Sequence, residues 1–287
     1  MKDRLLLGII GGSGLYDFPG LENRNSFEID TPFGKPSSPI ITGALNGKRI
    51  AFLARHGIGH ILSPSEVNYR ANIYALKSLG VSRLLSVSAC GSLHEDFAPG
   101  EIIIPDQIFD HTHKRARTFF EDGVVAHIGV PNPFCPKLSQ KVFSSLKKVK
   151  AATHLGGTFI TIEGPRFSTI AESNVFRSWG MSIIGMTACP EIFLAREAEM
   201  CYVTMAHVTD YDVWHSSEEP VSVEMVIKTL QNNTTTAQNA IRILLQDLED
   251  EEICECHTCL KDAIMTRADL IPEKEKSRLD PLIKKYL

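Results

Sequence analysis

Short apolar runs alternate with amphipathic segments along almost the whole chain. The apolar runs predict strands at 5–10, 40–45, 49–53, 83–89, 101–105, 158–163, 182–186 and 201–208. The amphipathic segments predict helices at 63–79, 136–148, 169–179, from 190 onward and at 222–248. Strands that alternate with helices indicate a single α/β domain over residues 1–287, with a central sheet flanked by helices.

The turn between the second and third strands refines this fold class. Asn46 and Gly47 stand between two apolar runs, and Asn-Gly favours a tight hairpin because both residues tolerate positive φ. A hairpin makes its two strands antiparallel, so the predicted sheet is mixed rather than purely parallel.

Two segments depart from the alternation. Residues 110–132 are polar and poorly periodic, which is typical of a long loop with a binding or interface role. From about residue 250 the chain turns acidic and then carries closely spaced cysteines, so we expect a helical C-terminal extension there.

Composition narrows the function classes. The 287 residues are 43% hydrophobic and 22% charged, as in an ordinary globular protein, and the net charge of −4 argues against nucleic acid or an anionic membrane as a partner. We find neither a signal-peptide pattern nor an apolar run of the roughly 20 residues that a membrane span needs, and we expect a cytoplasmic protein.

The seven cysteines fall into two groups. Four are scattered in apolar surroundings and are expected to be isolated buried thiols: Cys90, Cys135, Cys189 and Cys201. The other three crowd one short segment beside a histidine: Cys254, Cys256, His257 and Cys259. This segment could hold zinc, form a disulfide with the body, or keep free thiols. Because a second Cys-x₂-Cys pair is missing, a disulfide is favoured over zinc, and we predict no metal site.

The first strand runs into a loop of small residues. The apolar run 5–10 ends at Gly11-Gly12-Ser13-Gly14, where glycines let the backbone approach a ligand and Ser13 adds a hydroxyl. A dinucleotide fingerprint fails because Asp17 takes the place of its third glycine, and no Gly-Lys-Ser/Thr follows for a Walker loop. The loop therefore favours a simple anion.

Further anion-binding groups follow other predicted strands. Because strand ends meet at one edge of an open α/β sheet, we expect these groups to share a crevice with Ser13. Without a carboxylate among them they suit a free phosphate, with an arginine as bidentate partner. The set is Arg55, His56, Ser88, the backbone N–H of Ala89, and Thr187.

Two carboxylates lie at a further strand end. Asp210 and Asp212 follow a buried run and could act as a base and its partner, as metal ligands, or as acceptors for N–H groups of a ring. Metal is disfavoured because no third ligand stands at a suitable spacing. A serine hydrolase is unsupported because the chain has no Gly-x-Ser-x-Gly motif. The basic run 111–117 is interpreted as a solvated face.

Several motifs together resemble the 5′-methylthioadenosine phosphorylases of the trimeric purine nucleoside phosphorylase family. The resemblance covers about residues 7–245. Its motifs are Gly11-Gly12-Ser13-Gly14-Leu15, Thr31-Pro32-Phe33-Gly34-Lys35-Pro36-Ser37, Ala54-Arg55-His56-Gly57, Ser88-Ala89-Cys90-Gly91-Ser92-Leu93, Glu163-Gly164-Pro165-Arg166-Phe167-Ser168 and Thr209-Asp210-Tyr211-Asp212.

The resemblance implies a role for each matching position. Phosphate binding is implied for Ser13, Arg55, His56, Ser88, Ala89 and Thr187. Contacts to the nucleoside are implied for Phe167, Ser168, Met186, Thr209, Val223 and Val226, and for His127 offered across a subunit interface. Asp210 and Asp212 would read the purine N7 and 6-amino group and carry the chemistry.

The implied reaction is phosphorolysis of 5′-methylthioadenosine to adenine and 5-methylthioribose 1-phosphate. It needs no cofactor, only phosphate as co-substrate, in a homotrimer or a hexamer. The alternatives are a phosphorylase for 6-oxopurine nucleosides such as methylthioinosine, a hydrolytic nucleosidase, and a nucleoside-binding protein without catalysis. Two aspartates favour the 6-amino substrate, because a 6-oxo group would face a carboxylate lone pair to lone pair.

Overall fold

A computed structural model describes residues 5–12, 18–215, 223–249 and 253–287. In the first part of the long helix α5, side chains are described only for Glu224 and from Asn233 onward. Eleven described strands form one sheet: β1 (Leu7–Gly11), β2 (Glu22–Phe27), β3 (Ile40–Leu45), β4 (Lys48–Ala54), β5 (Arg83–Ser92), β6 (Ile102–Ile104), β7 (Gln107–His111), β8 (Thr153–Leu155), β9 (Thr158–Ile162), β10 (Ile183–Gly185) and β11 (Cys201–Asp210).

The sheet is mixed, as the sequence predicts. Its main path runs β2-β3-β4-β1-β5-β10-β9-β7, and β11 branches from β5 toward β6 and β8. The central strands β4, β1, β5 and β11 are mutually parallel, whereas β10 runs antiparallel to β5. Four strand ends therefore point the same way, and one neighbouring strand returns toward them.

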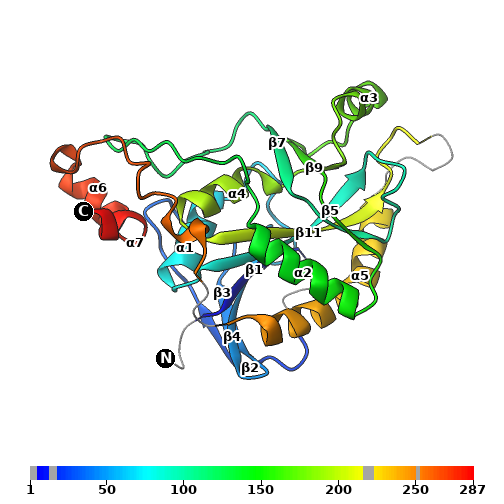
Figure 1. Cartoon of the computed structure of the whole chain (residues 1–287), viewed down its shortest axis with the longest axis horizontal. Coiled ribbons are helices and arrows are strands. Elements are labelled where there is room, and N and C mark those ends of the chain that lie inside the picture. The colour runs from blue at the N-terminus through cyan, green and yellow to red at the C-terminus, as the bar shows by residue number, and fades with distance from the viewer. Residues whose placement is uncertain (1–4, 13–17, 216–222, 250–252) are drawn as a thin grey trace.

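Helices cover both faces of the sheet (Figure 1). Their bounds are α1 (Tyr69–Ser78), α2 (Pro136–Lys148), α3 (Ile170–Ser178), α4 (Ala188–Glu197), α5 (Val223–Asp247), α6 (Glu273–Arg278) and α7 (Asp280–Ile283), with short 3₁₀ turns η1 (Glu255–Thr258), η2 (Ala268–Leu270) and η3 (Lys284–Tyr286). Helices α2 and α5 pack together on one face, and α1 and α4 pack on the other.

Strand β1 shows how the two faces are filled. Consecutive side chains of a strand point to opposite sides, so Ile9 packs into the core beneath α2 and α5 while Ile10 packs into the core beneath α1 and α4. Both are fully buried. A continuous apolar run, rather than an alternating one, is what a strand covered on both faces requires.

Local sequence signals give two clear outcomes. The hairpin is confirmed, with Asn46 at φ 52° and Gly47 at φ 74° between β3 and β4. The predicted start of the first helix at residue 63 is wrong, because α1 begins at Tyr69 with Asn68 as its N-cap, accepting a hydrogen bond from Ala71 N. Ser63 and Glu66 do bond to one another, but within a turn.

Some elements escape sequence reasoning altogether. Strand β7 lies where the loop 110–132 was expected to begin, and β2 and β8 were not predicted. All six residues of β2 are exposed and polar apart from Phe27, so the strand exists because it pairs with β3. Pairing of this kind leaves no periodic signal in the sequence.

The C-terminal extension packs back on the body rather than hanging free. Leu260, Leu279 and Ile283 are fully buried in the core that contains α1 and α4. Ala126 and Ile264 form an antiparallel bridge, so the extension also pairs with the long loop. None of the seven cysteines, all of which lie within the described residues, forms a disulfide in this structure, so the disulfide favoured by the sequence is absent.

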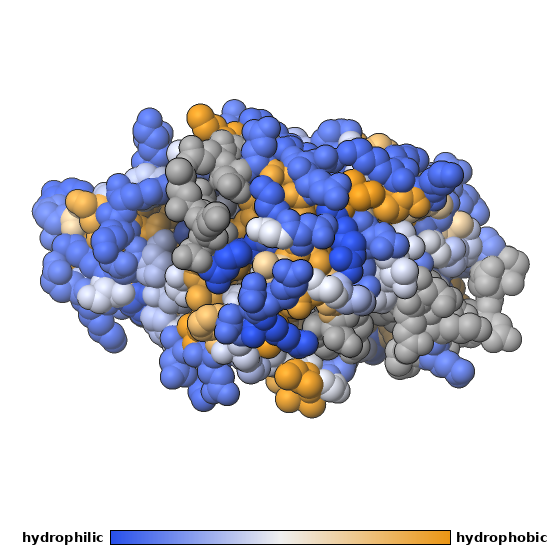
Figure 2. Space-filling model, turned by 90° about the horizontal axis from the view of Figure 1, so that it is seen from below, coloured by the Kyte–Doolittle hydropathy of each residue, from blue (hydrophilic) through white to orange (hydrophobic). Residues whose placement is uncertain are grey.

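The described surface carries only small apolar patches on the face seen in Figure 2, which is mostly hydrophilic. Among the described helices, none combines the length and apolarity needed to cross a membrane.

Candidate active site

The central parallel strands bring the predicted site residues to one edge. Arg55 follows β4, and its backbone N–H donates to Gly11 O at the end of β1 over 3.0 Å. Asp210 ends β11 and pairs with Gly91 of β5, after a register shift that follows Val208. The convergence that the sequence predicts for these residues is therefore present.

Ser88 and Ala89 reach the same place differently. They lie inside β5, because this strand continues three residues beyond its predicted end at residue 89. The antiparallel register pairs Ile183 with Ser92 and Ile184 with Gly91, and so carries Thr187 back toward Ser88. The returning strand β10 thus closes the site from the side.

Arg55 is held in the interior by Glu191. Its Nε donates to Glu191 Oε2 over 2.8 Å and its Nη2 to Glu191 Oε1 over 3.0 Å, with both side chains almost fully buried. Burial acts to lower the pKa of Arg55, but the ion pair with Glu191 outweighs burial. The pKa of Arg55 is therefore raised above its ordinary value.

This arrangement corrects the expected geometry at Arg55. Nη2 also donates to Ser86 Oγ over 2.7 Å, and Nη1 donates to Val87 O over 3.1 Å. A guanidinium has five N–H donors, so at most one Nη1 hydrogen is left for an anion. In this structure the Nε and Nη2 groups bind Glu191, which leaves one N–H of Arg55 for the predicted contact with phosphate.

His56 is a buried neutral imidazole. Burial, followed by the charge of Arg55, lowers its pKa to about 4. Its Nδ1 lies 2.9 Å from Leu62 O, and its ring stacks on His60 with centroids 4.2 Å apart. A neutral ring that donates from Nδ1 to a carbonyl leaves Nε2 as an acceptor, suited to the O–H of a hydrogen phosphate.

Two hydroxyls complete the described part of the predicted phosphate site. Ser88 Oγ is buried and has no hydrogen-bond partner among the described residues. Thr187 is the N-cap of α4 but makes no capping hydrogen bond with its side chain. Both hydroxyls are therefore available for hydrogen bonds to a bound anion. Ser13 lies outside the described residues.

Asp210 is buried and carries a strongly perturbed carboxyl. Its Oδ2 accepts from Thr209 Oγ1 over 2.6 Å and its Oδ1 from Asp212 N over 2.8 Å. Burial raises its pKa to about 6, against the effect of these hydrogen bonds and with a smaller contribution from the Asp212 charge. A carboxyl with this pKa can hold a proton near neutral pH.

Asp212 lies beside two further orphaned oxygens. Its Oδ2, Ser168 Oγ and Ser173 Oγ are buried without partners among the described residues. Burial raises the pKa of Asp212, and the nearby hydroxyls of Ser173 and Ser168 oppose the rise, although neither reaches hydrogen-bond geometry with the carboxylate. Asp212 adopts φ 53°, a conformation that Asp and Asn tolerate best after glycine. The pocket around Asp212 is therefore polar and incompletely satisfied.

Glycines make room for these groups. A Cβ on Gly91 would lie 2.9 Å from Asp210 Oδ1, and one on Gly164 would lie 2.6 Å from Met186 Sδ. Gly164 also has φ 68°, which a side chain rarely adopts. Met186 is half-buried against this turn.

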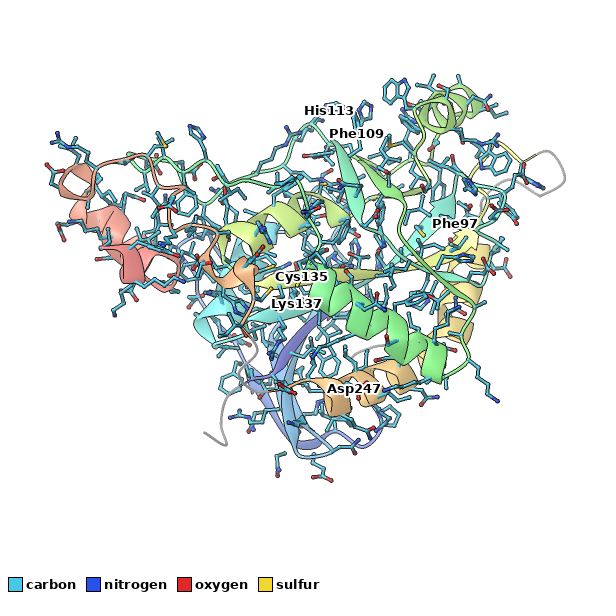
Figure 3. All side chains as sticks on the ribbon, viewed as in Figure 1. Phe97, Phe109, His113, Cys135, Lys137 and Asp247 are labelled. Atoms are coloured by element: carbon cyan, nitrogen blue, oxygen red, sulfur yellow. The ribbon has the colours of Figure 1, made fainter. Side chains whose placement is uncertain are left out.

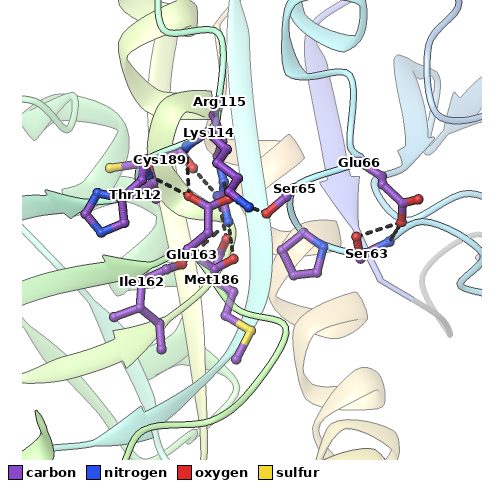
Figure 4. A network of polar contacts seen from close by, with 12 residues as sticks. Ser63, Ser65, Glu66, Thr112, Lys114, Arg115, Ile162, Glu163, Met186 and Cys189 are labelled. Carbon is purple, nitrogen blue, oxygen red and sulfur yellow. Dashed lines mark hydrogen bonds and ion pairs between the residues drawn. The ribbon is translucent and has the colours of Figure 1, made fainter.

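A second network, which sequence reasoning missed, surrounds Glu163 beside the turn at Gly164 (Figure 4). Glu163 accepts from Arg115 Nε over 3.2 Å, from His113 N over 2.6 Å and from the Ser65 hydroxyl. Arg115 Nη1 also donates to Met186 O over 2.6 Å. The sequence predicts a solvated face for the basic run 111–117, and this is wrong for Arg115, which is buried. Its ion pair with Glu163 ties the long loop to the turn at Gly164.

The remaining predicted residues are less central. Phe167 is 39% exposed beside half-buried Ser168. His127 is exposed on the long loop, where its backbone N–H donates to Ala263 O over 2.8 Å. A single chain therefore does not bring the His127 side chain to the site. The side chains of Val223 and Val226 lie outside the described part of α5.

Comparison with known proteins defines the class. A sequence model of the phosphorylase superfamily matches residues 6–246. The chain is 50% identical over 283 residues to S-methyl-5′-thioadenosine phosphorylase of Geobacter sulfurreducens, covering 98% of this chain and 99% of the relative. It is 52% identical over 281 residues to the enzyme of that name from Chloroflexus aurantiacus, covering 98% of each.

Solved structures agree with these relatives. A methylthioadenosine phosphorylase from an antarctic soil metagenomic library superposes with a TM-score of 0.93 at 45% identity, covering 98% of this chain and 99% of the other. The Schistosoma mansoni methylthioadenosine phosphorylase in complex with adenine gives 0.86 at 35% identity, covering 93% and 100%. The chain therefore belongs to the phosphorylase superfamily and, within it, to the S-methyl-5′-thioadenosine phosphorylase family.

Proposed function

We propose that this protein catalyses the phosphorolysis of 5′-methylthioadenosine to adenine and 5-methylthioribose 1-phosphate. The observation that carries the proposal is the buried pair Asp210 and Asp212, in which one carboxyl has a pKa of about 6 and the other presents an unsatisfied oxygen. The family's relatives named for this reaction support it.

Asp210 serves the leaving group. When the bond between C1′ and N9 breaks, its electron pair stays on the purine, and a purine anion leaves poorly. The carboxyl of Asp210 neutralises that charge by giving or sharing a proton at N7. Its raised pKa supplies a proton that an ordinary aspartate would have lost.

Asp212 selects the base. Its unsatisfied Oδ2 is an acceptor, and a 6-amino group is a donor, whereas a 6-oxo group is not. Leaving a buried carboxylate without a partner costs free energy, so adenine is preferred over hypoxanthine. The orphaned hydroxyl of Ser168 adds a second polar contact in the base pocket.

Phosphate serves as nucleophile. As C1′ gains positive charge, a phosphate oxygen attacks it on the face opposite the purine and forms the new C–O bond. Five groups position the phosphate: the hydroxyls of Ser88 and Thr187, the backbone N–H of Ala89, a single N–H of Arg55 and Nε2 of His56. Ser13 is assigned here from the sequence alone.

The assembly and the 5′ pocket remain expectations from the resemblance. We infer a homotrimer in which His127 of one subunit approaches the site of its neighbour, with Val223 and Val226 around the methylthio group. We also infer that phosphate is the sole co-reactant, without a cofactor, and that the enzyme works in the cytoplasm.

The test is adenine release from methylthioadenosine with and without phosphate, with methylthioinosine assayed in parallel. Phosphate-dependent release from methylthioadenosine supports the proposal. Release without phosphate makes the protein a nucleosidase, and preference for methylthioinosine overturns the role given to Asp212. Ligand-dependent thermal stabilisation without turnover of either substrate points to a binding protein.

A further inference from the structure

Four cysteines from three separate segments meet away from the nucleoside site. The Sγ atoms of Cys135, Cys201, Cys254 and Cys256 all lie within 4.8 Å of one another. Cys135 is the N-cap of α2, Cys201 begins β11, and the other two flank the start of η1 (Figure 3 labels Cys135). The sequence placed these residues in two unrelated groups, and only folding unites them.

The cluster lies far from the substrate. Cys201 and Asp210 are at opposite ends of β11, and a ten-residue strand spans about 30 Å. The cysteines therefore take no part in the phosphorolysis assigned to Asp210. A function at this place must be separate from the chemistry.

The sulfur spacing matches a tetrahedral metal site. Cys135 Sγ and Cys254 Sγ are 3.6 Å apart, whereas a disulfide requires about 2.05 Å. Four thiolates at the usual Zn–S length of about 2.3 Å stand about 3.8 Å from one another at the corners of a tetrahedron. An iron–sulfur cluster contains several metal and sulfide atoms and needs its cysteines further apart.

The surroundings suit four thiolates. A zinc ion with four thiolates keeps a net negative charge, and Arg196 Nη1 donates to Cys256 Sγ over 2.9 Å. His257 Nε2 lies 3.4 Å from Cys201 Sγ, and the N-terminus of the 13-residue helix α2 faces Cys135. A cavity of about 10 Å³ beside the cluster is lined by three of the cysteines together with Arg83 and Lys137.

We propose that Cys135, Cys201, Cys254 and Cys256 bind one Zn²⁺ ion as a structural site. Four protein thiolates leave no open position for substrate, so the site is structural rather than catalytic. The ion fastens the start of the C-terminal extension to the body at α2 and β11. This reverses the preference for a disulfide drawn from the sequence.

Loss of the ion has a consequence beyond the cluster. The extension continues from Cys256 to Ala263, which accepts from His127 N, and to Met265, whose N–H donates to Val125 O over 2.8 Å. Loss of the zinc contacts at the start of the extension therefore loosens the segment that carries His127. We expect loss of zinc to lower the melting temperature and, through the displacement of His127, to raise KM for the nucleoside.

The experiment measures metal in the full-length protein. Protein purified without chelator and desalted is analysed by inductively coupled plasma mass spectrometry, and about one zinc per chain is expected. A mercurial that blocks thiols should release it into a colorimetric zinc indicator. Absence of zinc, together with free thiols or a disulfide among the four cysteines in a non-reduced peptide map, overturns the proposal. Iron in place of zinc also overturns it.

Variants locate the ion. Cys254→Ser should lose zinc and melt at a lower temperature, whereas Cys259→Ser should keep zinc. Cys259 is a matched control because it lies in the same segment but donates to Arg196 O over 2.7 Å, outside the cluster. If Cys254→Ser fails to fold, Co²⁺ exchange into the unaltered protein decides: a tetrahedral thiolate spectrum in the visible region supports the site, and its absence contradicts it.

Discussion

Arg55 and Glu191 form a buried bidentate ion pair across the sheet edge, with N···O distances of 2.8 and 3.0 Å. The same Glu191 accepts from the Tyr202 hydroxyl over 2.8 Å. The arginine that the sequence assigned to phosphate is therefore first a structural residue. Its charge acts on the proposed phosphate site from a fixed position, and any direct contact with an anion there uses one N–H.

Glu191→Gln should destabilise the protein strongly. The neutral amide leaves the charge of Arg55 buried without its counter-ion, which costs about 3–5 kcal/mol. Urea unfolding followed by circular dichroism measures the change. Asp269→Asn is the control, since Arg267 and Asp269 also pair through two contacts but are mostly exposed, and it should have little effect. Equal losses in both variants would contradict the role given to burial.

Asp210→Asn should lower kcat/KM for methylthioadenosine by about 10²–10⁴-fold, because it removes the proton that N7 receives. In the unaltered enzyme the proton is present below the pKa of about 6, so kcat/KM should fall as pH rises through that value. The assay uses saturating phosphate at each pH. A descending limb that persists in Asp210→Asn would assign it to another group.

Asp212→Asn should shift the preference toward methylthioinosine. The amide can donate to a 6-oxo group, and the ratio of the two kcat/KM values should change by about 10²-fold or more. Asn tolerates the φ of 53° at this position, so the substitution tests recognition without adding backbone strain. Circular dichroism and melting confirm that the fold is intact. An unchanged ratio would remove Asp212 from base selection.

Glu163→Gln should raise KM for the nucleoside more than KM for phosphate. Its carboxylate joins the loop bearing Arg115 to the turn that backs Met186, and an amide nitrogen would face N–H donors there. Burial acts to raise the pKa of Glu163, but hydrogen bonds to it dominate and lower the pKa to about 2. Its stabilisation is therefore complete above about pH 4.5 and lost toward pH 2.

Kinetics at fixed pH compare the Glu163→Gln variant with Glu273→Gln, because the carboxylate of Glu273 is exposed where it pairs with Lys276. The control should match the unaltered enzyme. A parallel rise in both Michaelis constants for Glu163→Gln would indicate general loosening rather than a displaced nucleoside wall.

His207→Met should make the protein more resistant to acid. His207 is fully buried, neither ring nitrogen has a partner among the described residues, and burial lowers its pKa to about 4. The unfolded chain takes up a proton near pH 6.5 but the folded chain does not, so stability falls between about pH 6.5 and 4 by up to about 3 kcal/mol. Methionine does not titrate, so the variant should keep the stability that the unaltered protein loses in this pH range. Denaturant unfolding across the range measures it, and an unchanged slope would contradict the assignment.

The sequence by itself determined the fold class and the identity of the chemical groups. Continuous apolar runs such as 5–10 and 201–208 specify strands covered on both faces, and Asn46-Gly47 specifies the hairpin, because these are local effects of burial and backbone freedom. Strand-end placement was enough to group Arg55 and Asp210, since parallel strands end at a common edge.

Only the tertiary structure decided how those groups are used. Glu191 lies 136 residues from Arg55 and Glu163 lies 48 from Arg115, so no local pattern could announce either pairing. Burial raises the pKa of Asp210, and this burial depends on chain segments that approach only after folding. The same is true of the cluster that Cys135 and Cys201 form with Cys254 and Cys256. Local sequence sets the conformation of each segment, whereas electrostatics and ligation depend on which segments become neighbours.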